Sequence, residues 1–189
     1  MRILDVGCGQ CKFKGSVGID MQPLDGVDVV HDLNSFPWPF KENYFDRVIF
    51  KHSLAHLDDI LRVMEEVHRI GRDGAIVEII TPHFSSDNYF TDITHKHPMG
   101  YRSMNYVCQN IESWKYKYTN VNFDLMKVYI SFGEVEVDFN LNENRRRTNL
   151  HRVLGFEYLA NKAKRIYEKF FCFMITANTV YFSLEIVKR

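Results

Sequence analysis

The sequence lacks any long hydrophobic run, any excess of one charge and any regular array of cysteines. No stretch approaches the roughly 18 apolar residues that a membrane-spanning helix needs. Even the apolar-rich residues 170–181 are interrupted by Thr176, Asn178 and Thr179. The first apolar run is broken at Asp5, which is not typical of a secretory signal peptide. These absences predict a protein without a transmembrane segment that is located in the cytoplasm.

Charge and cysteine content exclude further classes of protein. The 24 Lys and Arg residues balance 24 Asp and Glu residues, so the formal net charge is zero. A dedicated nucleic-acid-binding domain normally carries a basic excess, and we therefore expect no nucleic-acid partner. Four irregularly spaced cysteines among 189 residues do not form a disulfide framework. Cys8 and Cys11 form one C-x-x-C pair, but a structural zinc site usually takes four ligands and the sequence has no second pair.

The pattern that is present indicates one α/β domain. Five short apolar segments predict strands, and their continuous apolar character is typical of a buried parallel sheet. These segments are residues 2–6, 16–20, 27–32, 45–50 and 75–80. Apolar residues at helical spacing between positions 57 and 68 predict a helix that begins near Asp58 or Asp59 and ends at Gly71. The resulting strand–helix–strand unit is typical of α/β folds.

The second half of the chain is less regular. Residues 81–101 are polar, aromatic and rich in histidine, which predicts a long loop of the kind that often carries function. The remaining predicted elements are a short helix over residues 103–111, a strand over 123–132, a helix over 149–171 and a strand over 179–187. The basic run Arg145-Arg146-Arg147 fits either a solvated turn or a contact with an acidic surface. The basic and aromatic helix over 149–171 fits a core or subunit interface, with a membrane surface as the alternative.

The first predicted strand runs into Gly7-Cys8-Gly9, where the absence of side chains lets a ligand approach the backbone. Ligands of open α/β sheets bind beyond the carboxyl ends of the strands. The dinucleotide fingerprint G-x-G-x-x-G requires a third glycine, but Lys12 occupies that position. Asp20, the acid that closes the second strand, also follows sooner than in that fingerprint. Both features argue against a dinucleotide cofactor.

Four motifs in order instead resemble the class I S-adenosylmethionine (SAM) dependent methyltransferases. They are Ile3-Leu4-Asp5-Val6-Gly7-Cys8-Gly9, Gly18-Ile19-Asp20, His31-Asp32-Leu33 and Phe45-Asp46-Arg47-Val48-Ile49. The stretches 27–34, 36–40, 52–57 and 94–97 are similar to the compact methyltransferase type 11 group. The resemblance implies a single domain over residues 1–189 with a Rossmann-like, three-layer α/β sandwich. Its mostly parallel seven-stranded sheet would have an antiparallel last strand and be reduced at the N-terminus.

The resemblance also implies which residues bind SAM. The glycine loop would hold the methionine part, Asp5 would orient the loop or the ammonium group, and Asp20 would accept hydrogen bonds from the ribose hydroxyls. The complete set of implied cofactor-binding residues is Asp5, Gly7, Cys8, Gly9, Asp20, Met21, Asp32, Leu33, Lys51 and His52. Residues 11–15 are too few for the usual helix after the first strand. We therefore expect an open site that the long loop, the C-terminal helix or a second subunit of a homodimer covers.

Histidines supply the candidates for catalysis. His52 follows the fourth strand, and His83 and His95 lie in the loop, so we predict that one of these three removes a proton from the acceptor. Asp92, His97 and Tyr101 are the predicted acceptor contacts. The cluster of His83, His95, His97 and Asp92 could also hold a metal, but we assign no metal site. His56, near a helix start, fits a capping or core histidine.

The predicted reaction is transfer of a methyl group from SAM to an oxygen or nitrogen of a small-molecule or sugar-containing acceptor. A SAM-binding regulatory module without activity is the main alternative, because Ala55 replaces a glutamate common in the type 11 group. A protein that binds no SAM and acts through protein interactions is a third possibility. RNA as the acceptor is disfavoured by the balanced charge and the lack of an aromatic-basic pattern.

Overall fold

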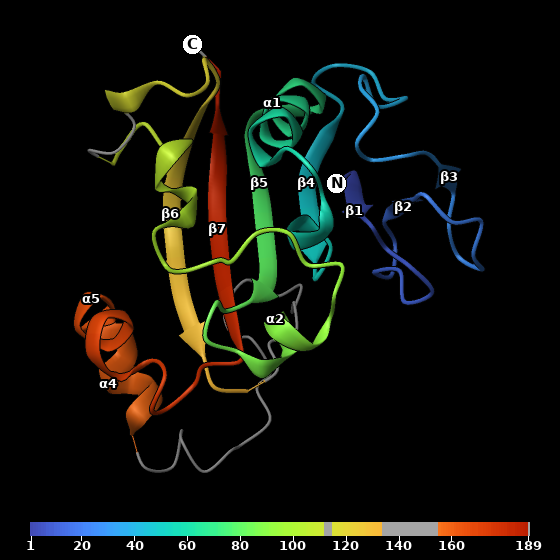
Figure 1. The fold of residues 1–189 in the computed structure, drawn as a ribbon. Helices are drawn as coiled ribbons and strands as arrows, with labels where there is room; N and C mark the ends of the chain where they lie inside the picture. Colours follow the sequence, from blue (N-terminus) through green and yellow to red (C-terminus); the bar gives the residue numbers. More distant parts are fainter. Residues whose placement is uncertain (112–114, 134–154, 189) are drawn as a thin grey trace.

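The computed structural model describes residues 1–111, 115–133 and 155–188 (Figure 1). Seven strands form one sheet in the order β3-β2-β1-β4-β5-β7-β6. Strands β1 to β5 pair in parallel, and β7 runs antiparallel between β5 and β6. The strand bounds are β1 Ile3–Val6, β2 Val17–Asp20, β3 Val29–Val30, β4 Phe45–Lys51, β5 Gly71–Pro82, β6 Asn122–Ser131 and β7 Thr179–Val187. The predicted α/β fold with an antiparallel last strand is confirmed.

Burial explains why the central strands form where the sequence predicted them. All four residues of β1 are buried, and so are five of the seven residues of β4. Strands covered on both faces need side chains that tolerate burial throughout, which a continuous apolar run supplies. Two boundaries differ from the prediction. Strand β3 is only two residues long, whereas β5 begins four residues earlier than the apolar run, at Gly71.

Helix α1 (Ile60–Ile70) connects β4 to β5 and packs on one face of the sheet (Figure 1). The Asp59 side chain caps its first turn by accepting a hydrogen bond from the backbone N–H of Arg62 at 3.1 Å. Val63, Val67 and Ile70 are fully buried on the side of the helix that faces the sheet. The predicted helix and its ends are confirmed.

The connection from β1 to β2 consists of turns over residues 7–16 and contains no helix. Lys12 lies over β2 instead, because a β-carbon on Gly18 would meet its Cδ at 2.6 Å. The Lys12 ammonium lies 2.7 Å from the Asp28 carboxylate, which also accepts the N–H of Gly18. The residue that breaks the dinucleotide fingerprint therefore closes this short connection.

Residues 33–40 form an irregular segment between β3 and β4 that is hydrogen-bonded to α1. The indole of Trp38 is buried and donates to the Leu33 carbonyl at 3.1 Å. Two α1 side chains fix the segment: Glu66 accepts the Trp38 backbone N–H, and Arg69 donates to the carbonyls of Trp38 and Phe40. The stretch over residues 36–40, which is similar to the type 11 group, is thus fixed against α1 by these hydrogen bonds.

Three predictions for the second half of the chain were wrong in detail. The loop over 81–101 contains a short helix, α2 (Asp87–Thr91), and only a 3-10 turn, η2 (Ser103–Tyr106), forms in the segment 103–111. The predicted helix over 149–171 is interrupted at Ala163, whose backbone leaves the helical region (φ −132°). Its pieces are α4 (Phe156–Lys162), α5 (Lys164–Ile166) and the π-helical turn η4 (Tyr167–Phe171). Residues 149–154 and the basic run 145–147 lie outside the described residues.

The helices that the structure describes do not include one long and apolar enough to cross a membrane.

Candidate functional site

The glycine loop follows β1 at the carboxyl edge of the sheet, and its backbone is bonded to β2. Gly7 and Gly9 both have left-handed backbones, with φ of 66° and 52°. The N–H of Gly7 donates to the Ile19 carbonyl at 2.8 Å. A β-carbon on Gly7 would overlap the β-carbon of Ser53, whereas one on Gly9 would meet nothing within 4 Å. Gly7 is therefore required for packing, and Gly9 leaves open space beside the backbone where a ligand can approach.

Two buried or half-buried carboxylates hold this loop. Asp5 accepts the backbone N–H of Phe13 at 2.8 Å, and Asp20 accepts the N–H of Gly9 at 2.9 Å. The pKa of Asp5 is raised, chiefly because burial removes water from its carboxylate, although the Phe13 N–H and the charge of Lys51 lower it. The second oxygen of Asp20 accepts only the N–H of Gln22 among the described residues, so lone pairs remain for hydroxyl donors.

The two cysteines of the C-x-x-C pair differ in their surroundings. Both cysteines are free thiols, with Cys8 buried and Cys11 exposed. Burial and the neighbouring charges of Asp5 and Asp20 raise the pKa of Cys8 to about 11. A thiol that stays protonated at neutral pH is a poor nucleophile and a poor metal ligand.

The other predicted cofactor residues come together around the loop from β3 and β4. Leu33 is buried, and its side chain would lie 3.7 Å from a β-carbon on Gly7. Asp32 is exposed and accepts the N–H of Asn34 and the hydroxyl of Ser35, which lowers its pKa. Met21 is also exposed, just beyond Asp20. A ligand that reaches from the glycine loop to β3 would pass the ends of β1, β2 and β3.

His52 directly follows β4 and has a strained left-handed backbone with φ of 58°. Its N–H donates to the Ile80 carbonyl of β5 at 2.8 Å, which fixes the bend. The side chain lines a polar pocket of about 350 Å³ at the ends of β4 and β5 and the start of β7. The residues that line this pocket are His52, His56, Pro82, Asn88, Asp92, His95, Asn178 and Thr179.

Three predicted residues lie elsewhere. His83 is completely buried, and its ring nitrogens bond to Ser85 (2.8 Å) and Glu168 (3.2 Å). Since neither nitrogen faces the polar pocket, we do not retain His83 as a candidate base. His97 contacts the Leu57 carbonyl and anchors the loop at the start of α1. Tyr101 donates its backbone N–H to Glu168 and lines a different pocket.

Five of the residues that line this pocket were not predicted as site residues, and His56 and Asn178 illustrate why. His56 ends the 3-10 turn η1 (Leu54–His56) and was interpreted as a capping or core residue. Asn178 precedes β7, 126 positions after His52 in the numbering. The spacing of His52 and His56 was the available signal for the first, but only the sheet order could have revealed the second.

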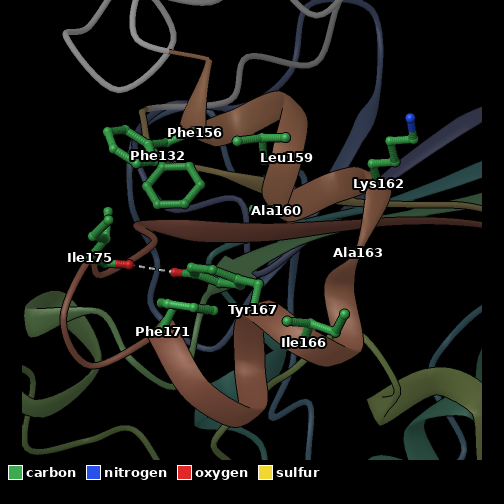
Figure 2. Close-up of a pocket in the computed structure, with 10 residues that line it drawn as sticks. All are labelled: Phe132, Phe156, Leu159, Ala160, Lys162, Ala163, Ile166, Tyr167, Phe171 and Ile175. Carbon is green, nitrogen blue, oxygen red and sulfur yellow. Dashed lines mark hydrogen bonds between the residues drawn. The ribbon is translucent and has the colours of Figure 1, made fainter.

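A second, larger pocket of about 470 Å³ lies between β6 and the C-terminal helices (Figure 2). Its lining is almost entirely apolar, and the Tyr167 hydroxyl inside it donates to the Ile175 carbonyl at 2.7 Å. The pKa of Tyr167 is raised by burial. The described residues that line this cavity include no acid–base pair, so it is less suited to catalysis than the smaller polar pocket.

Comparisons with known proteins agree with this architecture. Residues 4–79 match the family model described as the methyltransferase domain. The structure of a SAM-dependent methyltransferase from Archaeoglobus fulgidus is 20% identical, with 97% of this chain and 85% of that chain covered and a TM-score of 0.59. The resemblance to the methyltransferase type 11 group is confirmed over the matched residues.

Two further structures share the fold. A complex between the Haloferax volcanii Trm112 methyltransferase activator and its assigned methyltransferase gives 12% identity, 100% and 83% coverage and a TM-score of 0.58. The [4+2]-cyclase SpnF gives 16% identity, 100% and 75% coverage and a TM-score of 0.57. No curated protein sequence matches the chain. Together, these structures show the shared fold, and the family match covers residues 4–79 of it.

Proposed function

We propose that this chain, with its methyltransferase domain over residues 4–79, transfers a methyl group from SAM to an oxygen or nitrogen of a small-molecule or sugar-containing acceptor. The observation that carries the proposal is the position of His52. It follows Lys51, whose charge acts on Asp5 beneath the glycine loop, and its side chain lines the polar pocket. A donor on the loop and an acceptor in the pocket would therefore meet beside this residue.

The residues at the strand ends fit SAM. Open space beside Gly9 leaves room for the methionine part, and the remaining lone pairs of the half-buried Asp20 carboxylate suit the ribose hydroxyls. When bound, SAM supplies an activated methyl group on a sulfonium centre. The protein then has two tasks, which are to align the acceptor and to accept its proton.

The polar pocket provides groups for both tasks. Asn88 and Asn178 offer amide donors and acceptors that can orient a hydroxyl or an amine. His52 and His95 are the remaining histidine candidates for the base, and His52 is the exposed one at the end of β4. A polar lining favours a polar acceptor, and this supports a hydroxylated small molecule or sugar over an apolar one.

The localisation prediction also belongs to this proposal. All four cysteines are free thiols, which supports a reducing cytoplasmic setting for the enzyme.

Calorimetry with SAM, followed by transfer of labelled methyl groups from SAM to fractionated polar small molecules, tests the function. We expect SAM to bind, a labelled product to form and S-adenosylhomocysteine to inhibit its formation. His52→Ala should reduce turnover at saturating SAM by about 100-fold or more, the usual contribution of a general base. His31→Gln, a histidine outside the polar pocket, is the matched control. Absence of SAM binding would refute the proposal.

A SAM-binding module without methyl transfer remains the second candidate. SpnF, whose fold is similar, is a [4+2]-cyclase, and a fold hosts more than one activity. Ala55 is fully buried, and alanine supplies no carboxylate at the position where the type 11 group commonly has glutamate. SAM binding without transfer to any acceptor, and without an effect of His52→Ala, would favour this candidate.

A further inference from the structure

Three side chains with metal-binding atoms meet at one wall of the polar pocket. His56 comes from η1, Asp92 ends α2, and His95 follows three residues later in the loop. One potential ligand atom from each lies within 4.8 Å of the other two. The rings of His56 and His95 are 4.5 Å apart between centroids. Among the residues that the structure describes, this is the group of histidine, cysteine and carboxylate side chains with metal-site geometry.

Hydrogen bonds orient both imidazoles with the same nitrogen directed away from protein acceptors. His95 Nδ1 lies 3.0 Å from the Tyr89 carbonyl oxygen. A carbonyl only accepts, so this nitrogen carries the proton and Nε2 keeps its lone pair. The His95 ring also stacks on the Tyr89 ring at 5.5 Å, with an interplanar angle of 4°.

The His56 ring is oriented by a short relay. Thr94 Oγ1 donates its single proton to Asp92 Oδ1 at 2.6 Å, and His56 Nδ1 lies 2.8 Å from the same hydroxyl oxygen. Because the hydroxyl proton is directed to the carboxylate, His56 Nδ1 must be the donor in the second bond. His56 Nε2 therefore also keeps its lone pair, and no partner for it is found in the described part of the chain.

Metal-ligating histidines usually donate their other ring N–H to a carbonyl, a carboxylate or a comparable oxygen, which fixes the tautomer. His56 and His95 both have Nδ1 bonded to a protein oxygen in this way. The Asp92 carboxylate is held by the hydroxyl and the N–H of Thr94. The cluster therefore offers two imidazole nitrogens and one carboxylate.

Two imidazoles and one carboxylate form a donor set that suits divalent transition metals, whereas Mg²⁺ and Ca²⁺ prefer oxygen ligands throughout. Three protein ligands also leave a coordination position free, as in catalytic rather than structural zinc sites. We propose that His56, Asp92 and His95 bind one divalent transition-metal ion whose open position faces the polar pocket. The metal alternative considered from the sequence combined Asp92 and His95 with His83 and His97, which lie elsewhere, and did not include His56.

The site would have a direct use in the proposed reaction, and this part of the inference rests on the proposed function. An acceptor hydroxyl that ligates the open position would become more acidic and would be held in place. His52, which lines the same pocket, could then accept its proton. The ion would thus restrict the acceptor to molecules that present an oxygen ligand.

Titration of the metal-free chain with Co²⁺, followed by visible absorption, tests the site without SAM or an acceptor. Competition with Zn²⁺ gives the affinity for the second ion. We expect one ion per chain, with nitrogen and oxygen ligands. Asp92→Asn and His95→Gln should each weaken binding by about 100-fold or more, and Thr94→Val, which removes the relay, by about 10-fold. Asp92 is exposed, so its variant should fold normally.

Two controls exclude other ligands. His31→Gln removes a histidine outside the cluster, and Cys11→Ser removes the exposed thiol of the C-x-x-C pair. Both should bind Co²⁺ as the unaltered chain does. Failure of the unaltered chain to bind, binding that is unchanged in Asp92→Asn, or loss of binding in Cys11→Ser would each overturn the metal site. A chain that binds the metal but transfers no methyl group would refute only the proposed function.

Discussion

Gly7 and Ser53 are in such close contact that only glycine fits at position 7. A β-carbon there would overlap the β-carbon of Ser53, whose hydroxyl donates to the Val6 carbonyl at 2.5 Å. The glycine loop after β1 and the bend after β4 are therefore locked together. This contact sets the distance between the proposed cofactor loop and His52, which precedes Ser53.

Gly7→Ala should disrupt both stability and SAM binding. The left-handed backbone costs about 1–2 kcal/mol for a residue with a β-carbon, and the overlap with Ser53 adds about 1–3 kcal/mol. Thermal unfolding should show a lower Tm, and calorimetry at a temperature where the variant is folded should show weaker SAM binding.

Gly15→Ala is the matched control. Gly15 also has a left-handed backbone (φ 83°), but a β-carbon there would meet nothing within 4 Å. We expect only the loss from backbone strain and unchanged SAM affinity. An equal loss of SAM affinity in both variants would show that strain, and not the contact with Ser53, accounts for the effect.

Asp5→Asn should separate stability from binding. The pKa of Asp5 is raised on folding, so the folded chain binds its proton more tightly than the unfolded chain does. The ionised carboxylate therefore opposes folding at neutral pH. We expect Asp5→Asn to raise the Tm at pH 7, since Asn can still accept the Phe13 N–H, while SAM binding weakens by about 10-fold, roughly one charge-assisted hydrogen bond.

The pH dependence checks the sign of this effect. The penalty applies fully above the folded-state pKa and disappears as the pH falls below the unfolded value of about 3.9. The difference in unfolding free energy between the two proteins should therefore shrink on acidification. Asp25→Asn, at an exposed position, should change neither quantity. A destabilised Asp5→Asn protein at pH 7 would contradict the argument.

The sequence predicted the central sheet because buried parallel strands carry an unmistakable apolar pattern. β7 occurs at the predicted residues, and α1 ends at the predicted Gly71. The C-terminal helix was overestimated because its apolar spacing continues through Ala163, where the backbone leaves the helical region. No local signal marks that break, since alanine itself favours helix.

The candidate site was only partly predictable. The glycine loop and Asp20 belong to two successive motifs at the ends of neighbouring parallel strands, so their proximity could be anticipated from the strand–loop–strand unit. The grouping of loop histidines could not be anticipated, because a polar loop without periodicity does not reveal which side chains face each other. His83 turned toward Glu168, and His95 toward His56. Distant packing of the C-terminal helices decided the first of these orientations.

Asp20→Asn tests the predicted ribose contact. Asn can still accept the Gly9 N–H through its amide oxygen, so the loop should keep its position. The amide provides one acceptor atom where the carboxylate provides two, so ribose hydroxyls lose a charged acceptor. We expect SAM to bind at least about 10-fold more weakly, equal to one charge-assisted bond of roughly 1.5–3 kcal/mol. Methionine alone, which has no ribose, should show no such difference, and its equal weakening would place Asp20 at the other end of the cofactor.

A buried ion pair in the sheet should contribute to the free energy of unfolding without contacting SAM. Arg47 of β4 and Glu78 of β5 are buried neighbours, and the Arg47 Nε donates to Glu78 Oε2 at 2.5 Å. Tyr181 of β7 donates its hydroxyl to the other Glu78 oxygen at 2.8 Å and has a raised pKa because of burial. Glu78→Gln leaves the arginine charge without its buried counter-ion, which should cost about 3–5 kcal/mol.

Tyr181→Phe removes one hydrogen bond but keeps the ion pair, so it should cost about 1 kcal/mol. Urea unfolding of both variants measures the two losses. The stability of these strands matters because the central strands of the sheet carry the glycine loop and His52 on their carboxyl ends. If the ion pair acts only on the sheet, SAM affinity per folded molecule should be the same in both variants. Weaker binding by folded Glu78→Gln alone would instead show that the β4–β5 pairing sets the geometry of the site.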